Sequence, residues 1–319
     1  MAVSDFRLAV LTLAKACLCI FLSAPILAAT NVSFGATLEV GANKTYKMPS
    51  EAAAVAKDGD HIEIAPGEYF DCAIWQADNL LIEGTGPGVV ITDKTCQGKG
   101  LFVVNGNNTT IKNLTLTRAR VPDMNGAGIR LDRGNLTVDG VKFINNQDGI
   151  LGGHPGETII IRNSDFVKNG GCAPTCAHGI YINNADLLRV ENSRFSETQQ
   201  AHSIKSRAAR TEVIGCTISD GATGTSSYLI DVPNGGAVLV RGNTLQKGPK
   251  SENHTTAIAI GEEGVTQRTP EITISDNTFR NDGDFNTFLV WNATATPAAL
   301  KNNKLSGAVA PLKGDGESN

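Results

Sequence analysis

Excess positive charge is absent from this sequence. Lys and Arg together number 28 against 32 Asp and Glu, and the formal net charge is −4. Aromatic residues make up only 5% of the chain. A protein that binds nucleic acid needs a basic chain or a basic stripe, so nucleic acid is not an expected partner. An anionic ligand would have to be held by a local cluster of basic side chains.

Long apolar stretches are also missing beyond the N-terminal segment. That segment carries Arg7 and Lys15, then a short apolar run over residues 16–22, and it ends in small residues. This order is typical of a secretory signal peptide, and the run is too short for a membrane span. A retained N-terminal anchor is the alternative. We expect residues 1–29 to be removed, leaving a secreted or periplasmic protein without membrane association.

Cysteine is scarce as well. Five of the seven cysteines lie beyond the signal segment, which permits at most two disulfides and leaves one thiol. Cys172 and Cys176 lie in a turn-rich segment, and we expect them to pair. His178 is nearby, but two sulfurs and one imidazole lack the fourth ligand of a structural zinc site, so no metal is expected. The others are assigned to a second candidate disulfide and a buried free thiol: Cys72 with Cys96, and Cys216.

An internal repeat is the main signal in the sequence. A six-residue template recurs: an aliphatic residue, any residue, a turn former such as Asn, Gly or Asp, two further residues, and a final Leu, Ile or Phe. Each copy reads as two short strands joined by a bend, where the turn former tolerates a left-handed backbone. The eight copies begin at Ile111, Val138, Ile161, Val190, Val213, Val240, Ile274 and Leu300.

Eight copies of one hexamer predict a solenoid, because one coil cannot bury its own apolar face but stacked coils can. We expect an all-β, single-domain, right-handed parallel β-helix of about nine or ten coils over residues 49–306. A lead-in over 30–48 precedes it, a short helix over 50–57 caps the first coil, and residues 307–319 form a polar, disordered tail. The alternative, a β-sandwich, would not repeat one hexamer at a period near that of a coil.

Two segments near the start of the repeat region carry a family resemblance. Together with the hexamer, DGDHIEIAPGEYFD and NLLIEGTG resemble the pectin-lyase-like family of right-handed parallel β-helices, over roughly residues 45–306. The resemblance implies this fold and an elongated groove suited to a polysaccharide. It implies no single reaction, because such folds carry lyases, epimerases, hydrolases and non-catalytic adhesins.

One outward row of side chains in the predicted coils is polar. Six strands upstream of successive hexamers share an inward Ile at the second position, so their third and fifth residues face outward. The third positions read Arg130, Leu151, Tyr181, Lys205, Asp231 and Ala259. The fifth positions read Asp132, Gly153, Asn183, Arg207, Pro233 and Gly261. With His178 and His202 just before their strands, the polar groups concentrate in three coils.

This strip predicts a functional site, with a solvated strand face as the alternative. Six residues are the expected catalytic set: Lys205, Tyr181, Arg207, His202, His178 and Asp231. Four more are expected to bind substrate: Asn183, Arg130, Asp132 and His154. Loops on both sides are long enough to wall a groove, and three rim residues are each expected to be ordinary surface: His254, Glu262 and Glu263.

The chemistry that these residue types favour is removal of the proton next to the carboxylate of a uronic acid, which begins both β-elimination and C5 epimerisation. The carboxylate charge must be neutralised, and Arg207 can hold it through two hydrogen bonds. We expect Lys205 to be the base, with a pKa lowered by burial and by Arg207, and Tyr181 to move a proton to or from the sugar.

The Lys and Arg chemistry is similar to that of β-helical polysaccharide lyases. The acidic calcium cluster that some of these lyases place beside their lysine is missing from the predicted column. No cofactor is therefore expected, and the expected partner is an anionic polysaccharide.

Two other functions stay open. Glycoside hydrolysis needs two carboxylic acids across the scissile bond. Asp231 is one candidate, and its partner would be Asp132, Glu262 or Glu263, none of which lies one coil away in the same column. A non-catalytic glycan-binding or cell-surface β-helix would use the same groove without a proton carrier.

Overall fold

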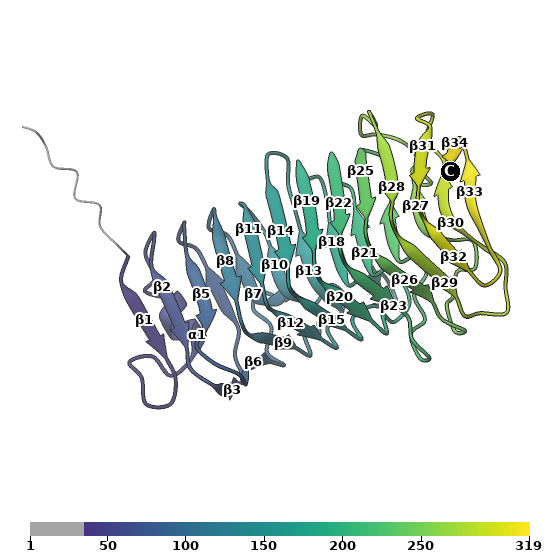
Figure 1. Ribbon diagram of the computed structural model, residues 1–319. Helices are drawn as coiled ribbons and strands as arrows, with labels where there is room; N and C mark the ends of the chain where they lie inside the picture. The colour runs from purple at the N-terminus through teal and green to yellow at the C-terminus, as the bar shows by residue number, and fades with distance from the viewer. Residues whose placement is uncertain (1–34) are drawn as a thin grey trace, which may run out of the picture. The chain divides into compact units, whose positions relative to one another are not determined.

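The computed structural model describes residues 35–319. Their strands form a parallel solenoid of about 11 turns, which Figure 1 shows as rows of arrows stacked along one axis. The predicted signal peptide over residues 1–29 lies outside the described residues. Within residues 35–319, no helix is long and apolar enough to cross a membrane.

Three parallel sheets run along the solenoid. The twelve strands of sheet A are, in spatial order, β1 (Thr37–Val40), β2 (His61–Ile64), β5 (Leu81–Gly84), β8 (Thr109–Lys112), β11 (Leu136–Asp139), β14 (Thr158–Arg162), β19 (Leu187–Glu191), β22 (Arg210–Ile214), β25 (Ala237–Arg241), β28 (Ile272–Ser275), β31 (Ala298–Lys301) and β34 (Gly316–Ser318). The ten strands of sheet B are β3 (Gly67–Tyr69), β6 (Val89–Thr92), β9 (Thr115–Thr117), β12 (Lys142–Ile144), β15 (Asp165–Val167), β20 (Arg194–Ser196), β23 (Thr217–Ser219), β26 (Thr244–Lys247), β29 (Thr278–Asn281) and β32 (Lys304–Ser306).

Sheet C carries the site. Its ten strands are β4 (Ala73–Trp75), β7 (Gly100–Val104), β10 (Ala127–Leu131), β13 (Asp148–Gly152), β18 (Ile180–Ile182), β21 (Ile204–Ser206), β24 (Ile230–Val232), β27 (Thr256–Ile260), β30 (Thr287–Asn292) and β33 (Val309–Gly314). A separate antiparallel hairpin of β16 (Gly171–Cys172) and β17 (Cys176–Ala177) precedes β18. The predicted parallel solenoid is confirmed, with slightly more turns than the hexamer count indicates.

The repeated hexamer forms the bend between sheet A and sheet B. Its third residue adopts a left-handed backbone in all eight copies, with φ between 47° and 69°, as predicted: Asn113, Gly140, Asn163, Asn192, Gly215, Gly242, Asp276 and Asn302. Side chains after the bend join successive coils, since the Asn243 amide donates to Asn277 and the Asn277 amide to Asn303, each over 2.9 Å. These bonds satisfy polar groups inside the solenoid and hold the coils in register.

A continuous apolar core fills the interior of the solenoid, with side chains from all three sheets. Phe143, Phe166 and Phe195 end three successive hexamers and stack inside it, with ring centroids 4.5 Å apart in both pairs. This spacing is close to the distance between neighbouring strands of a sheet, so the rings repeat with the backbone. Figure 1 shows the corresponding strands β12, β15 and β20 side by side.

The two ends of the solenoid differ from the prediction. The capping helix is shorter than expected: α1 (Pro49–Ala53) has one turn and buries Pro49 and Ala52. The predicted disordered tail is wrong, because residues 309–318 form β33 and β34, which pair with β30 and β31. Val309 and Leu312 of this segment also pack against the core, so a largely polar, glycine-containing segment completes a last turn.

The cysteine predictions are confirmed. Cys172 bonds to Cys176 within the hairpin, and Cys72 bonds to Cys96 near the N-terminal end of the solenoid. Cys216 is free and buried, and burial raises the pKa of its thiol to about 11. The hairpin disulfide lies next to the polar strip of sheet C, whereas the other lies far from it along the chain.

Candidate functional site in sheet C

The structure confirms that the predicted outward residues stand in register on neighbouring strands of sheet C. Strand register pairs Arg130 with Leu151, Leu151 with Tyr181, Tyr181 with Lys205, and Lys205 with Asp231. The alternating isoleucines of these strands face the interior and are fully buried. The neighbouring column members therefore lie one strand spacing apart, about 4.8 Å, on the outer face of sheet C.

Loops cover part of this outer face. The side chain of Asp231 is fully buried and that of Lys205 is only 8% exposed, although both leave the sheet on its outer side. The covering segment is the loop over residues 261–271, between β27 and β28, which carries Glu262 and Glu263. A groove of about 470 Å³ remains open beside it, lined by groups that include Tyr181 and Lys205.

A network of ion pairs organises the open groove. The Glu263 carboxylate accepts a hydrogen bond from Lys205 Nζ over 2.6 Å and pairs with an Arg207 terminal nitrogen over 2.5 Å. Arg207 Nε donates to the Tyr181 hydroxyl oxygen over 3.0 Å, and another Arg207 nitrogen donates to Asn234. Tyr181, Lys205 and Arg207 thus form one contact group, as the sequence predicts.

The two histidines face the same groove as neutral hydrogen-bond donors. His178 Nδ1 accepts the backbone N–H of His202 over 3.2 Å, and His202 Nδ1 accepts the backbone N–H of Tyr228 over 3.1 Å. Burial, with smaller contributions from Lys205 and Arg207, lowers the pKa of His178 to about 3. Burial, followed by His178 and Lys205, lowers the pKa of His202 well below its usual value.

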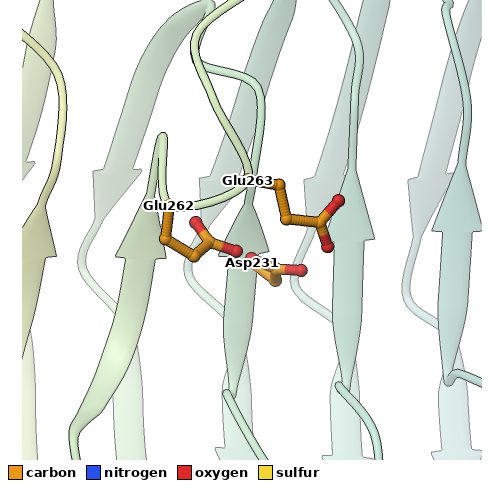
Figure 2. Close-up of side chains that lie close together, drawn as sticks. All are labelled: Asp231, Glu262 and Glu263. Carbon is orange, nitrogen blue, oxygen red and sulfur yellow. The ribbon is translucent and has the colours of Figure 1, made fainter.

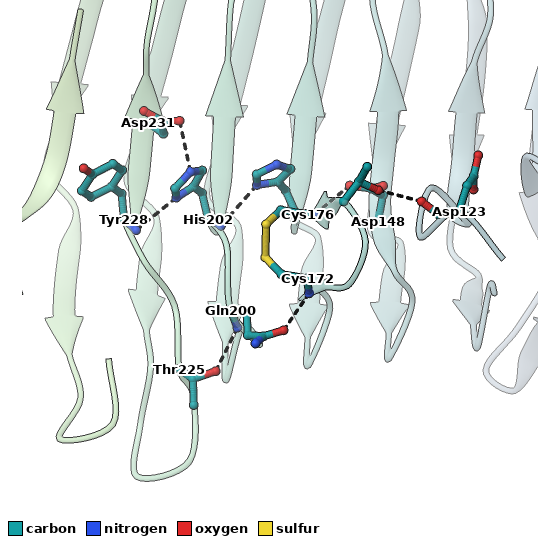
Figure 3. The surroundings of a disulfide bond; sticks show 11 residues. Asp123, Asp148, Cys172, Cys176, Gln200, His202, Thr225, Tyr228 and Asp231 are labelled. Atoms are coloured by element: carbon teal, nitrogen blue, oxygen red, sulfur yellow. Dashed lines mark hydrogen bonds and ion pairs between the residues drawn. A yellow bond between two sulfur atoms is a disulfide. The ribbon is translucent and has the colours of Figure 1, made fainter. Parts of the chain in front are cut away.

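These contacts determine the tautomers of both rings. A neutral imidazole whose Nδ1 accepts a hydrogen bond carries its proton on Nε2. His202 Nε2 lies 3.3 Å from an Asp231 oxygen, an approach that is visible in Figure 3. The two rings stack with centroids 5.0 Å apart. Neither ring is available as a general base at neutral pH, because each Nδ1 already accepts a backbone N–H. Of the predicted catalytic roles, only hydrogen-bond donation through Nε2 is left to them.

Three carboxyl groups lie together beside Lys205, contrary to the expectation that no acidic cluster accompanies it. Oxygens of Asp231, Glu262 and Glu263 lie within 4.8 Å of one another. Figure 2 shows Glu262 turned toward Asp231, whereas the Glu263 carboxylate points away toward the neighbouring strand. The signal was missed because the two glutamates belong to a loop and not to the column.

Asp231 is an acid held in a dry environment. Burial and then the neighbouring Glu262 carboxyl raise the pKa of Asp231 well above its usual value. Lys205 Nζ lies 3.2 Å from one Asp231 oxygen, although neither oxygen receives a well-aligned hydrogen bond. These three carboxylates are the group that could hold a cation, but the Lys205 ammonium already lies among them as their counter-charge.

The position of Asp231 corrects its predicted catalytic role. A glycosidase carboxyl must touch the scissile bond, and a fully buried side chain cannot. Glu262 and Glu263 supply the nearby acidic partners that hydrolysis would require, yet Asp231 itself is closed off from the groove. Hydrolysis through Asp231 is therefore disfavoured.

The predicted base also differs from expectation. Burial acts to lower the pKa of Lys205, but the carboxylates of Asp231 and Glu263 outweigh it, so the pKa is raised. The same contacts lower the pKa of Glu263 against the effect of its own burial. Lys205 is an ammonium in this structure, a group that neutralises negative charge and does not accept a proton. The expectation of a lowered pKa is wrong because it considered Arg207 but not the two carboxylates.

The four predicted substrate-binding residues are not brought together. Arg130 lies two coils before Tyr181 and pairs with Asp132, whose other oxygen pairs with Lys99. His154 is exposed in the turn after β13 and does not line the groove. Asn183 is exposed directly after β18, near Arg207 in the neighbouring coil. None of the four lines the groove, and Asn183 is the one that lies in the coil next to Arg207.

The hairpin disulfide forms one wall of the groove. Cys172 and Cys176 both line it, next to His178. The Cys172 N–H donates to the Gln200 side chain over 2.6 Å, and the Gln200 N–H donates to Thr225, which ties the hairpin to the next two coils (Figure 3). This wall lies opposite the 261–271 loop across the polar row.

Comparison with known proteins agrees with this architecture. Residues 173–313 match the family described as the right-handed β-helix region. The match agrees with the parallel β-helix that the described residues form. No curated protein is significantly similar to this β-helix in sequence.

Two solved structures resemble the β-helix over most of its length. An alginate lyase from Paenibacillus sp. str. FPU-7 has a TM-score of 0.65 at 19% identity, covering 84% of this chain and 96% of that chain. The pectate lyase Pel9A has a TM-score of 0.58 at 14% identity, covering 89% of this chain and 80% of that chain. At these identities the likeness shows the fold alone.

Proposed function

We propose that this protein acts on an acidic polysaccharide by removing the C5 proton of a uronic acid, with β-elimination as the outcome. One observation carries the proposal. Lys205, Tyr181 and two neutral imidazoles line one groove and Arg207 adjoins it through Tyr181 and Glu263, whereas the carboxyl of Asp231, on which hydrolysis would depend, is buried.

The first requirement of the reaction is neutralisation of the uronate carboxylate. The C5 proton is weakly acidic until the negative charge beside it is balanced, and positioned cations and donors supply that balance best in a site sheltered from water. Lys205 and Arg207 already hold one carboxylate together, that of Glu263. His178 lines the same groove and carries its proton on Nε2, whereas His202 Nε2 faces Asp231.

The second requirement is a group that moves protons, and Tyr181 fits it. Its hydroxyl oxygen accepts a hydrogen bond from Arg207, and its ring centroid lies 5.8 Å from Lys205 Nζ. In β-elimination the ionised Tyr181 oxygen, which accepts from Arg207, takes up the C5 proton, the electron pair of the C5–H bond forms the C4–C5 double bond, and the bond from C4 to the glycosidic oxygen breaks; the Tyr181 hydroxyl then returns that proton to the leaving oxygen. Tyr181 adjoins both cations and is positioned for these transfers.

Two similar folds support this choice of reaction class. The β-helix is similar to an alginate lyase and a pectate lyase. Both names describe lyases of acidic polysaccharides. Epimerisation begins with the same proton removal, and it differs in that the proton returns to the opposite face of the sugar.

Incubation with uronic-acid polymers tests the proposal. The chain without residues 1–29 should release unsaturated uronates, detected by their ultraviolet absorbance, from alginate or from a galacturonan. Arg207→Lys keeps the charge but cannot contact the carboxylate, Tyr181 and Asn234 at once as Arg207 does, so it should lower this rate. Arg210→Lys is the matched control, because Arg210 pairs with Glu212 and Glu271 outside the groove.

Other outcomes identify other functions. Exchange of hydrogen for solvent deuterium at C5 without cleavage would replace elimination by epimerisation. New reducing ends without unsaturation would overturn the proposal in favour of hydrolysis. Binding of a polymer without any turnover would support a non-catalytic glycan-binding protein.

A further inference from the structure

Glu263 is the most unusual acidic residue on the groove. Its carboxylate bridges Lys205 and Arg207, one oxygen to each, and its side chain is 42% exposed. Asp231 also pairs with Lys205 but is fully buried. One of the two anions beside Lys205 is therefore enclosed in the protein, while the other reaches in from a surface loop.

The backbone around Glu263 is held in place. Its N–H donates to the Pro233 carbonyl over 3.1 Å, and the Asn234 amide donates to the Gly264 carbonyl over 2.9 Å. Farther along the loop, Gln267 reaches back to Asn184 and to the Arg207 carbonyl, over 2.9 Å and 3.1 Å. A change at Glu263 therefore requires only rotation of its side chain, with the rest of the loop in place.

From this geometry we propose that Glu263 occupies the binding position of the substrate's carboxylate in the ligand-free protein, and that a uronate displaces it on binding. We call this position, between Lys205 Nζ and the Arg207 guanidinium, the carboxylate seat. The proposal rests on the function proposed above and adds its specificity: the ligand carries a free, unesterified carboxylate. A uronate would present the same two oxygens to the same two cations as Glu263 does.

The displacement is feasible because the ion pair is partly solvated. Glu263 is the exposed partner, at 42% against 8% for Lys205 and 24% for Arg207, so water solvates its carboxylate when it leaves. Both cations keep a partner when Glu263 leaves, because Lys205 Nζ still lies 3.2 Å from Asp231 and Asn234 still accepts from Arg207. The competition nevertheless lowers the apparent affinity, since only molecules with an open seat can bind ligand.

Glu263→Ala tests the proposal. It should tighten the binding of free-acid oligouronates, measured by calorimetry in a Tyr181→Phe background, by about tenfold, because the seat is then always open. Methyl-esterified oligomers should show no such gain. Glu271→Ala is the control, since it removes an ion pair with Arg210 at the other end of the same loop. An affinity that falls, or that changes as in the control, would overturn the proposal.

A second measurement does not depend on the polymer. Acetate should raise the melting temperature of Glu263→Ala but not of the wild type or of Glu271→Ala, because only the first has an open carboxylate seat. If acetate stabilises Glu263→Ala while no oligouronate binds any variant, the seat stands and the proposed function fails. If neither acetate nor oligouronate distinguishes Glu263→Ala from the control, Glu263 is a structural residue and the inference is wrong.

Discussion

The inner and outer rows of sheet C share one backbone but follow opposite rules. The inner row repeats isoleucine in six successive coils, in register from each strand to the next: Ile129, Ile150, Ile180, Ile204, Ile230 and Ile258. The outer row, one residue later in each strand, changes in every coil from Arg130 to Ala259. Identical residues in successive coils pack well in the interior. A functional site on the outer face instead needs different chemical groups in neighbouring coils.

The difference between the rows separates stability from chemistry. An inner residue contributes through apolar burial and packing, which are nearly the same at each coil. The chemical role of an outer residue depends on the loops that cover it. In the covered part of the row Asp231 is fully buried, and Lys205 is paired with Glu263 from the 261–271 loop. Substitutions in the inner row should therefore change unfolding, and substitutions in the outer row should change function.

The largest expected effect is on turnover. Tyr181→Phe removes the proposed proton carrier and should lower the rate of unsaturated product formation by about 10²–10⁴-fold. Oligouronate binding should stay close to that of the wild type, because Lys205 and Arg207 remain. Tyr46→Phe, in the first turn of the solenoid, is the control. An equal loss in both variants would mean that the outer row does not carry the chemistry.

Removal of an interior ring should lower stability and leave turnover unchanged. Phe166→Ala leaves a cavity in the aromatic stack and should lower the free energy of unfolding by about 3–5 kcal/mol, measured in urea. Below its melting temperature the variant should keep turnover. Val167→Ala, a half-buried position on the same strand, should cost much less. A folded Phe166→Ala protein without activity would break the separation of the two rows.

The third effect depends on pH. His178 is neutral in the folded protein, with a pKa of about 3 against 6.5 when unfolded. The unfolded chain therefore binds more protons below about pH 6.5, and stability is lost as the pH falls from there toward 3. Between pH 7 and about pH 4.5 the contribution is on the order of 3 kcal/mol.

A matched pair of variants isolates this contribution. His178→Gln should show a smaller loss of unfolding free energy between these pH values than the wild type, and His154→Gln, at an exposed site, should not. Asp148, whose pKa burial raises, faces the backbone N–H of residue 178 in both proteins, so its opposite contribution cancels in the comparison. An unchanged pH dependence in His178→Gln would mean that the ring is not buried as a neutral donor.

How far the sequence predicts this molecule follows from the same contrast between rows. The hexamer shows each bend, because only a few residue types tolerate the left-handed backbone found at Asn113 or Gly140. The outer column was predictable because period-2 alternation sets which side chains leave the sheet. Lys205 and Tyr181 were found in this way, from local pattern alone.

The remaining features depend on contacts that have no period. Glu263 reaches Lys205 across 58 residues of sequence, through a loop whose path no alternation determines. The charge state of Lys205 follows from that contact, so it was predicted with the wrong sign. The last coil was missed because its few apolar residues, Val309 and Leu312, form too short a pattern to read, although they pack against the core while β33 and β34 pair with β30 and β31.

The smallest expected effect compares the two disulfides. In the chain-entropy model, loss of the short Cys172–Cys176 loop costs about 2 kcal/mol of unfolding free energy, and loss of the longer Cys72–Cys96 loop costs about 3.5 kcal/mol. Cys172 and Cys176 also wall the groove beside His178. Replacement of this pair by serine should therefore weaken oligouronate binding, although it destabilises the protein less.

The Cys72–Cys96 pair serves as the control for that experiment. Its replacement by serine should lower the free energy of unfolding more and leave oligouronate affinity unchanged in the folded protein, because this disulfide lies outside the groove. Calorimetry and urea unfolding on the two double variants provide both quantities. If oligouronate affinity instead falls in proportion to the free energy of unfolding in the two variants, the hairpin disulfide only stabilises its coil. The groove wall then has no part in binding the ligand.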